Sequence, residues 1–155
     1  MDTAGSELKR IRGWLLLLCL CLTILDPTAV LVNLFLVSEV GRPFFSRQPG
    51  FFHLVLVNGV AGIALAVFSL YAGVSLFRRV SGAPAIARKY FAAISAYAVI
   101  APFLPFLLRS EQLATRENFY INCLNSFFTM AYALIWRLYL QRSRRVQQTY
   151  GPDLH

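Results

Sequence analysis

The feature that most constrains this sequence is an apolar run of twenty-four residues, from Trp14 to Val37, that contains a single charged side chain, Asp26. A helix that crosses the roughly 30 Å hydrocarbon core of a bilayer needs about twenty residues of this kind. At about 1.5 Å of rise per residue, Asp26 would lie about 18 Å along from Trp14, close to the membrane midplane. Pro27 removes the backbone hydrogen bond to the carbonyl of Thr23, so we expect the helix to bend there. The run therefore predicts a bent membrane-spanning helix with a carboxyl near its centre.

Three further apolar runs follow, and the composition of the whole chain agrees with them. Of 155 residues, 57% are hydrophobic and 14% charged, and the mean hydropathy is +0.58. This leaves too little polar surface for a soluble domain of the same size. We predict an all-α membrane protein, a single four-transmembrane-helix bundle over residues 1–155, with spans at 14–37, 52–77, 90–108 and 119–141.

The segments between the predicted spans carry turn-forming residues. Residues 38–50, which read SEVGRPFFSRQPG, are rich in glycine and proline and predict a turn between the first two spans. Pro102 and Pro105, near the end of the third span, predict a kink or an unwound last turn. The second span has small residues at spacings of four, three and four, which favour close packing of a neighbouring helix: Gly62, Ala66, Ser69 and Gly73.

Lysine and arginine are distributed unevenly between the two sides of the predicted bundle. Eleven lie in the N-terminal segment, in residues 78–89 and at the C-terminal end, and four lie on the other side. The positive-inside rule then predicts that both termini are cytoplasmic. The formal charge of +8 indicates contact with anionic lipid rather than with nucleic acid, because the basic residues flank apolar runs. The candidates for lipid-headgroup contacts are Arg142, Arg144 and Arg145.

Asp26 allows two interpretations. A carboxyl in the hydrocarbon core costs several kcal/mol, so it is usually functional or buried against protein. In the first interpretation it accepts hydrogen bonds from a neighbouring helix and fixes the packing. In the second it is a proton or cation site.

The fourth apolar run supplies polar groups that could surround this carboxyl. Its asparagines and a threonine follow at spacings of four, three and four, which place them on one helical face: Asn118, Asn122, Asn125 and Thr129. Such residues either hydrogen-bond between helices or line a polar cavity. By helical rise, Asn58 and Asn125 lie at about the depth of Asp26. We therefore hypothesise an intramembrane polar site formed by Asp26, Asn58, Asn122, Asn125 and Thr129.

No arrangement of residues in the sequence indicates catalysis. Cys19 and Cys21 fall on nearly opposite faces of one helix, Cys123 lies in another span, and His53 stands alone at the start of the second. Neither a catalytic Ser/His/Asp set nor metal-ligand spacing nor a phosphate-binding glycine loop occurs. We expect a non-enzymatic protein with no cofactor and no metal.

The C-terminal stretch, residues 136–150, is the most distinctive, and we expect it to continue the fourth helix out of the membrane with Tyr139, Val146 and Tyr150 near one side. It resembles the ending W-x-x-Y-F-x-x-S-x-R-V-x-x-T-F of the domain of unknown function 2569 (DUF2569) family of small bacterial inner-membrane proteins. The matching residues are Trp136, Tyr139, Ser143, Arg145, Val146 and Thr149, while Leu140 and Tyr150 replace the two phenylalanines. The resemblance extends to Gly13-Trp14-Leu15, Pro27 and the segment from Phe77 to Tyr90. It implies four spans and residence in the bacterial inner membrane, and it brings no activity.

Together these patterns favour a multi-pass inner-membrane protein that works by binding a membrane lipid or a membrane-protein partner, which includes a second copy of itself. The alternative is a component of a small-solute or proton-coupled transporter or channel that uses Asp26 and the asparagine face of the fourth span. Four short spans are few for a transporter that acts alone, so this alternative requires an oligomer.

Overall fold

The computed structural model describes residues 13–45, 49–108 and 115–143, together with residues 146 and 150. The elements in chain order are α2 (Trp14–Leu20), η1 (Cys21–Leu25), α3 (Asp26–Phe45), α4 (Pro49–Phe77), α5 (Ala83–Ile100), η2 (Ala101–Phe103), α6 (Leu104–Leu107) and α7 (Arg116–Arg142). The described residues contain no β-strand. The all-α prediction is confirmed.

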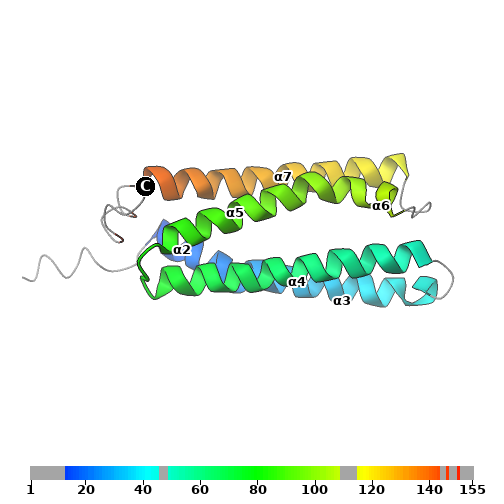
Figure 1. Cartoon of the computed structure of the whole chain (residues 1–155), viewed down its shortest axis with the longest axis horizontal. Helices are drawn as coiled ribbons and strands as arrows, with labels where there is room; N and C mark the ends of the chain where they lie inside the picture. The colour runs from blue at the N-terminus through cyan, green and yellow to red at the C-terminus, as the bar shows by residue number, and fades with distance from the viewer. Residues whose placement is uncertain (1–12, 46–48, 109–114, 144–145, 147–149, 151–155) are drawn as a thin grey trace, which may run out of the picture.

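The long helices form two antiparallel pairs. Figure 1 shows α3 beside α4 and α5 beside α7, with the start of α2 and the end of α7 at the same end of the bundle. The helix of the first apolar run changes direction at η1, a five-residue π-helix that immediately precedes Asp26 and Pro27. As a result α2 leaves the line of α3 and lies between the two pairs (Figure 1). The bend expected at Pro27 is present. The wider π-helical turn that precedes Pro27 accommodates the missing N–H of this proline.

Three helical stretches are long and apolar enough to cross a membrane: Trp14–Glu39, Gly50–Phe77 and Ala83–Leu107. These stretches indicate a multi-pass membrane protein. Helix α7 has 27 residues but is not one of the three. Its asparagines and Arg137 lower its hydropathy, so the assignment of a fourth span rests on further argument.

Two predicted loops are shorter than expected. The turn predicted at residues 38–50 is wrong over residues 38–45, which belong to α3, and α4 already begins at Pro49. Proline is tolerated at the first position of a helix, where its missing N–H has no intrahelical partner. Helix α5 begins at Ala83, before the predicted start of the third span at residue 90, and has Pro84 in its first turn. Near Pro102 and Pro105, where a kink or an unwound last turn was predicted, the chain stays helical: the 3₁₀-helix η2 and the four-residue α6 follow α5.

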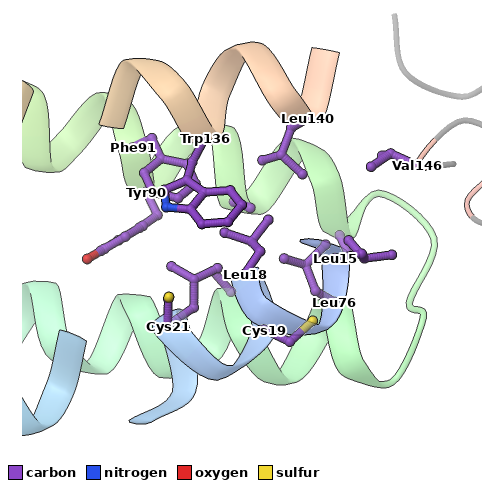
Figure 2. Packing of buried hydrophobic residues seen from close by; sticks show 14 of the residues in the cluster. Leu15, Leu18, Cys19, Cys21, Leu76, Tyr90, Phe91, Trp136, Leu140 and Val146 are labelled. Carbon is purple, nitrogen blue, oxygen red and sulfur yellow. The ribbon is translucent and has the colours of Figure 1, made fainter. Parts of the chain in front are cut away.

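The buried apolar core fills the half of the bundle that contains α2. Figure 2 shows Leu15 and Leu18 of α2 between Leu76 of α4 and Trp136 of α7. Phe91 and Tyr90 complete this cluster from α5, and the hydroxyl of Tyr90 points away from it (Figure 2). The rings of Tyr90, Phe91, Tyr132 and Trp136 form a continuous series of edge-to-face contacts with centroids 5.3–6.4 Å apart. This half of the bundle is thus closed by large side chains.

The prediction that the C-terminal stretch continues the fourth helix is wrong. Helix α7 ends at Arg142, and Ser143 is extended, with φ −74° and ψ 114°. Val146 is fully buried in the core cluster, and the hydroxyl of Tyr150 donates to the carbonyl of Leu76 over 2.6 Å. That carbonyl lies in the last turn of α4 and also accepts the backbone N–H of Arg79 over 3.2 Å, so Tyr150 supplies a second donor. Burial raises the pKa of the Tyr150 phenol above its ordinary value, so the hydroxyl remains a donor even in alkaline solution. Residues 146 and 150 therefore anchor the chain end to the bundle.

Replacing Tyr150 with phenylalanine is expected to lower the free energy of unfolding by about 1 kcal/mol, because the Leu76 carbonyl loses its side-chain donor. Tyr71→Phe is the matched control, since Tyr71 is 59% exposed. The measurement is the thermal unfolding midpoint in detergent micelles. Equal midpoints for the two variants would mean that the Tyr150 bond contributes nothing.

Candidate functional site

The site begins with the π-helical turn η1. The backbone N–H of Asp26 donates to the carbonyl of Cys21, five residues back. The residue five after Leu22 is Pro27, which has no N–H, so the Leu22 carbonyl has no intrahelical partner. Ser69 of α4 fills this gap: its buried hydroxyl donates to the Leu22 carbonyl over 2.8 Å. A local irregularity in the first apolar run is thus satisfied by the helix that packs against it.

The small-residue face of α4 makes this contact possible. A Cβ added at Gly73 would lie 2.6 Å from Thr23 Cγ2 and 2.9 Å from Leu22 Cβ, and one at Gly62 would lie 3.2 Å from Val30 Cγ1. The first apolar run therefore lies directly on the α4 backbone, as the spacing of small residues had predicted.

Three hydroxyl groups lie within hydrogen-bonding distance of the Asp26 carboxyl. Tyr90 of α5 donates to Asp26 Oδ2 over 2.8 Å, and Tyr132 of α7 lies 3.2 Å from Oδ1. Ser69 Oγ lies 3.3 Å from Oδ2, but its single proton points to the shorter bond with Leu22. Through its carboxyl Asp26 thus joins α3 to α5 and α7, while Ser69 of α4 donates to the nearby Leu22 carbonyl.

Replacing Ser69 with alanine is expected to cost about 1 kcal/mol or more, because the buried Leu22 carbonyl is left unpaired. Ser95→Ala is the control: the Ser95 hydroxyl donates over 2.7 Å to Phe91 in its own helix, a carbonyl within the regular α5 ladder. The measurement is the thermal unfolding midpoint in micelles, which should fall for the Ser69 variant and stay unchanged for the Ser95 variant. A loss of the same size in both variants would contradict a special role for Ser69.

Beyond Asp26, away from the core cluster, lies a cavity of about 590 Å³. Its polar lining residues come from α3, α4, α5 and α7: Asp26, Asn33, Asn58, Tyr90, Tyr97, Asn122, Asn125, Ser126, Thr129 and Tyr132. Apolar side chains such as Val30, Leu65, Ile94 and Phe128 fill the spaces between them. The volume falls within the range of roughly 300–1,000 Å³ found for small-molecule sites.

All five residues of the hypothesised polar site line this one cavity: Asp26, Asn58, Asn122, Asn125 and Thr129. Asp26 contacts tyrosines and not the asparagines of the fourth run. Asn58 accepts a hydrogen bond from Tyr97 and donates to the Leu54 carbonyl over 2.8 Å. Thr129 donates to the carbonyl of Asn125 in its own helix, and the side chain of Asn125 is exposed.

Three tyrosines that sequence reasoning did not assign to the site are central to it. Tyr90 and Tyr97 are seven residues apart, and Tyr132 is seven residues after Asn125, so each continues a polar face of its helix. That periodicity was the available signal. Their hydroxyls reach the carboxyl of Asp26 and the amide of Asn58.

The cavity opens to the side of the bundle, between α3 and α7. Helix α3 packs on α4, α4 on α5, and α5 on α7, whereas in the described chain α3 and α7 form no comparable interface. The exposure of the lining residues also differs between the two sides of the cavity. Ala29 and Asn33 of α3 and Asn125 and Phe128 of α7 are exposed, while the lining residues that are buried come from α4 and α5: Ala66, Tyr90 and Ala98. We call the opening between α3 and α7, formed by Ala29, Asn33, Asn125 and Phe128, the mouth of the cavity.

The other residues considered from the sequence lie apart from the cavity. Cys19 and Cys21 are buried in the core cluster, and His53 is exposed near the start of α4. Within the described residues no three His, Cys, Asp or Glu side chains are grouped as a metal site would require. Of the predicted headgroup contacts, Arg142 is exposed at the end of α7, and Arg144 and Arg145 lie outside the described residues.

Comparison with known proteins addresses the resemblance noted in the C-terminal stretch. Residues 8–151 match the family described as "Protein of unknown function (DUF2569)". Neither the curated proteins nor the solved structures contain a match to this chain. The matched region covers the described helices and the C-terminal stretch, and the chain belongs to the DUF2569 family.

Proposed function

We propose that this protein is a non-enzymatic membrane protein that binds an amphipathic ligand taken up sideways from the bilayer. The observation that carries the proposal is the cavity of about 590 Å³, which is lined by apolar side chains with a set of polar groups among them and is open between α3 and α7. Its lining residues on α3, α4 and α5 fall inside the three stretches long enough to cross a membrane. At this depth a lateral opening faces lipid chains.

The chemistry of the mouth supports a polar occupant. Asn33 and Asn125 are exposed, and an amide that faces hydrocarbon without a partner costs several kcal/mol. Alanine, valine, leucine and phenylalanine side chains line the same space. A ligand with one polar end and an apolar body would satisfy both kinds of surface. Asp26 is hydrogen-bonded to Tyr90 and Tyr132 rather than to a hydroxyl nucleophile such as Ser126 or Thr129, an arrangement that favours binding over catalysis.

The proposal includes a topology of four spans, with α7 as the fourth and both termini in the cytoplasm of a bacterial inner membrane. The 27 residues of α7 extend over about 40 Å, enough to cross a bilayer. Arg78, Arg79, Lys89 and Arg142 are exposed at the end of the bundle where α2 begins (Figure 1). Such a concentration of positive charge supports a cytoplasmic location for that end. Two reporters are fused to the C-terminus in turn, one that is active only in the cytoplasm and one that is active only in the periplasm. We expect activity from the first alone, and activity of the second would overturn this topology.

Closing the mouth tests the proposed binding. Ala29→Trp places a large ring at the mouth without disturbing a buried contact, and Ala64→Trp is the matched control on an exposed alanine of α4 outside the cavity. The measurement is native mass spectrometry of the proteins released from lipid nanodiscs. We expect an amphipathic molecule bound to the native protein and the Ala64 variant, and its loss from the Ala29 variant. Equal retention by both variants would contradict the proposal, as would a homodimer without a bound small molecule.

A second candidate is a proton- or solute-coupled transport function, favoured by the position of Asp26 where the cavity meets the core. Tyr90 and Tyr132 connect this carboxyl to two further helices, so a change in its protonation could alter the packing of α5 and α7. Counterflow of a labelled solute in vesicles, present in the native protein and absent in Asp26→Asn, would support transport. Binding without flux would exclude it.

A further inference from the structure

The charge of the cavity is carried by one residue. Asp26 is the only ionisable acid or base of the Asp, Glu, Lys, Arg and His types among the lining residues, and the other polar lining groups are amides and hydroxyls. An ion pair joins Arg42 and Glu39, and neither residue is among those that line the cavity. The cavity therefore contains a single acidic group and no basic side chain to balance it.

In its hydrogen bonds with the two tyrosines, the Asp26 carboxyl is the acceptor. The phenol of Tyr90 donates to Oδ2 and that of Tyr132 lies within reach of both oxygens. These bonds come from the core side and from α7, while the carboxyl still contributes to the cavity lining. A carboxylate that accepts two such bonds has lone pairs left for a further donor. A donor that also carries positive charge gains most from this position, because charge-assisted bonds are about twice as strong as neutral ones.

Aromatic rings around the same space favour a cation over a neutral donor. Tyr97, Phe128 and Tyr132 line the cavity, and the faces of aromatic rings attract cations, most strongly where water is excluded. Asn58, Asn122 and Asn125 add amide oxygens. A phosphate group would find no cation among the lining residues and would be repelled by Asp26. Phospholipid headgroups are therefore poor occupants.

We propose that the cavity selects lipophilic monocations, molecules with an ammonium-like centre and an apolar body, and binds the cationic centre against Asp26. This inference rests on the proposed function and specifies the charge of the ligand. It assigns Asp26 the role of the charge-selecting residue and the rings of Tyr97, Phe128 and Tyr132 the role of surrounding the cationic centre, while the aliphatic side chains of the lining contact the apolar body. The proposal specifies the charge and polarity of the ligand rather than its source, because any hydrophobic amine dissolved in the bilayer has this chemistry.

The experiment compares three rigid probes that share an adamantane cage and differ in charge: 1-adamantylammonium, which is a cation with N–H donors, adamantane-1-carboxylate, which is an anion, and 1-adamantanol, which is neutral. Saturable binding of each to the full-length protein in nanodiscs is measured by equilibrium dialysis. The Ala29→Trp protein in the same lipids serves as the blank for partition into the bilayer. We expect the native protein to bind the cation about tenfold or more tightly than either other probe. Asp26→Asn should reduce cation affinity to that for the neutral probe.

The outcomes separate this inference from the proposed function. Saturable binding of all three probes with about equal affinity would overturn the cation inference and leave the laterally open binding site intact. Absence of saturable binding above the blank for every probe would overturn both. An unchanged cation affinity in Asp26→Asn would also overturn the inference. If Asp26→Asn does not fold, the ranking of the three probes by the native protein decides the question.

Discussion

Replacing Gly73 with alanine is expected to destabilise the protein by about 2 kcal/mol or more. The new methyl group would lie 2.6 Å from Thr23 Cγ2, 2.9 Å from Leu22 Cβ and 3.1 Å from the backbone nitrogen of Thr23. The backbone of the π-helical turn would have to move away from α4. That movement would also weaken the bond between Ser69 and the Leu22 carbonyl, so the effect should exceed a simple loss of contact.

Gly59→Ala is the control on the same helix. A Cβ at Gly59 would lie 3.4 Å from Leu34 Cδ2, which is ordinary van der Waals contact. Alanine is a better helix former than glycine by about 0.5–1 kcal/mol, so this variant should be as stable as the native protein or more so. The thermal unfolding midpoint in micelles measures both. A Gly73 variant as stable as the Gly59 variant would show that α4 and η1 are further apart than described.

Replacing Trp136 with alanine is expected to cost about 3–5 kcal/mol, which is enough to prevent accumulation of folded protein. Trp136 is 7% exposed and belongs to the core cluster with Leu18 and Phe91. Its ring contacts those of Tyr132 and Tyr139 with centroids 6.4 and 5.8 Å apart. Removing it would leave a void between α7 and α2, where its ring lies above Leu18 in the core cluster (Figure 2).

Trp14 provides the comparison within the same aromatic contact. The rings of Trp14 and Trp136 have centroids 6.4 Å apart, but Trp14 is 67% exposed. Trp14→Ala should therefore cost less than about 1.5 kcal/mol, the upper value for an aromatic pair. Size-exclusion profiles of fluorescent fusions report the folded amount of each variant. Similar folded yields for the two variants would contradict the assignment of the core to the α2 half.

Local chemistry in the sequence was sufficient to predict the helical class, from the apolar runs, and the bend at Pro27. The bend depends on a missing backbone N–H, which acts within one helical turn, and near Pro102 and Pro105 the same cause produces a 3₁₀ turn rather than an unwound end. The predicted loop at residues 38–50 was wrong over much of its length because glycine and proline lower helix propensity without forbidding a helix. Gly41 is buried within α3, and Pro49 occupies the first position of α4. Tertiary packing outweighed intrinsic propensity there.

Five members of the candidate site were predictable from the sequence, whereas its three tyrosines and the contacts of Asp26 were not. Helical periodicity places Asn122, Asn125 and Thr129 on one face, and depth places Asp26 near them. The partners of Asp26 are Tyr90 and Tyr132, which are 64 and 106 residues away in sequence. Which faces meet depends on the rotation of each helix and on the displacement of α2 by the π-turn. Neither is encoded in a local pattern.

The central claim is that the cavity is open to the bilayer between α3 and α7, and photolabelling from the lipid phase tests it most directly. The protein is reconstituted with a lipid that carries a diazirine in its acyl chain, irradiated, and mapped by mass spectrometry. Leu65 and Ile94 line the interior of the cavity, whereas Leu31 is exposed on the outside of α3. We predict label at all three positions, with label at Leu65 and Ile94 lost in Ala29→Trp. Label at Leu31 alone in the native protein would show that the bundle is closed, and would contradict the account.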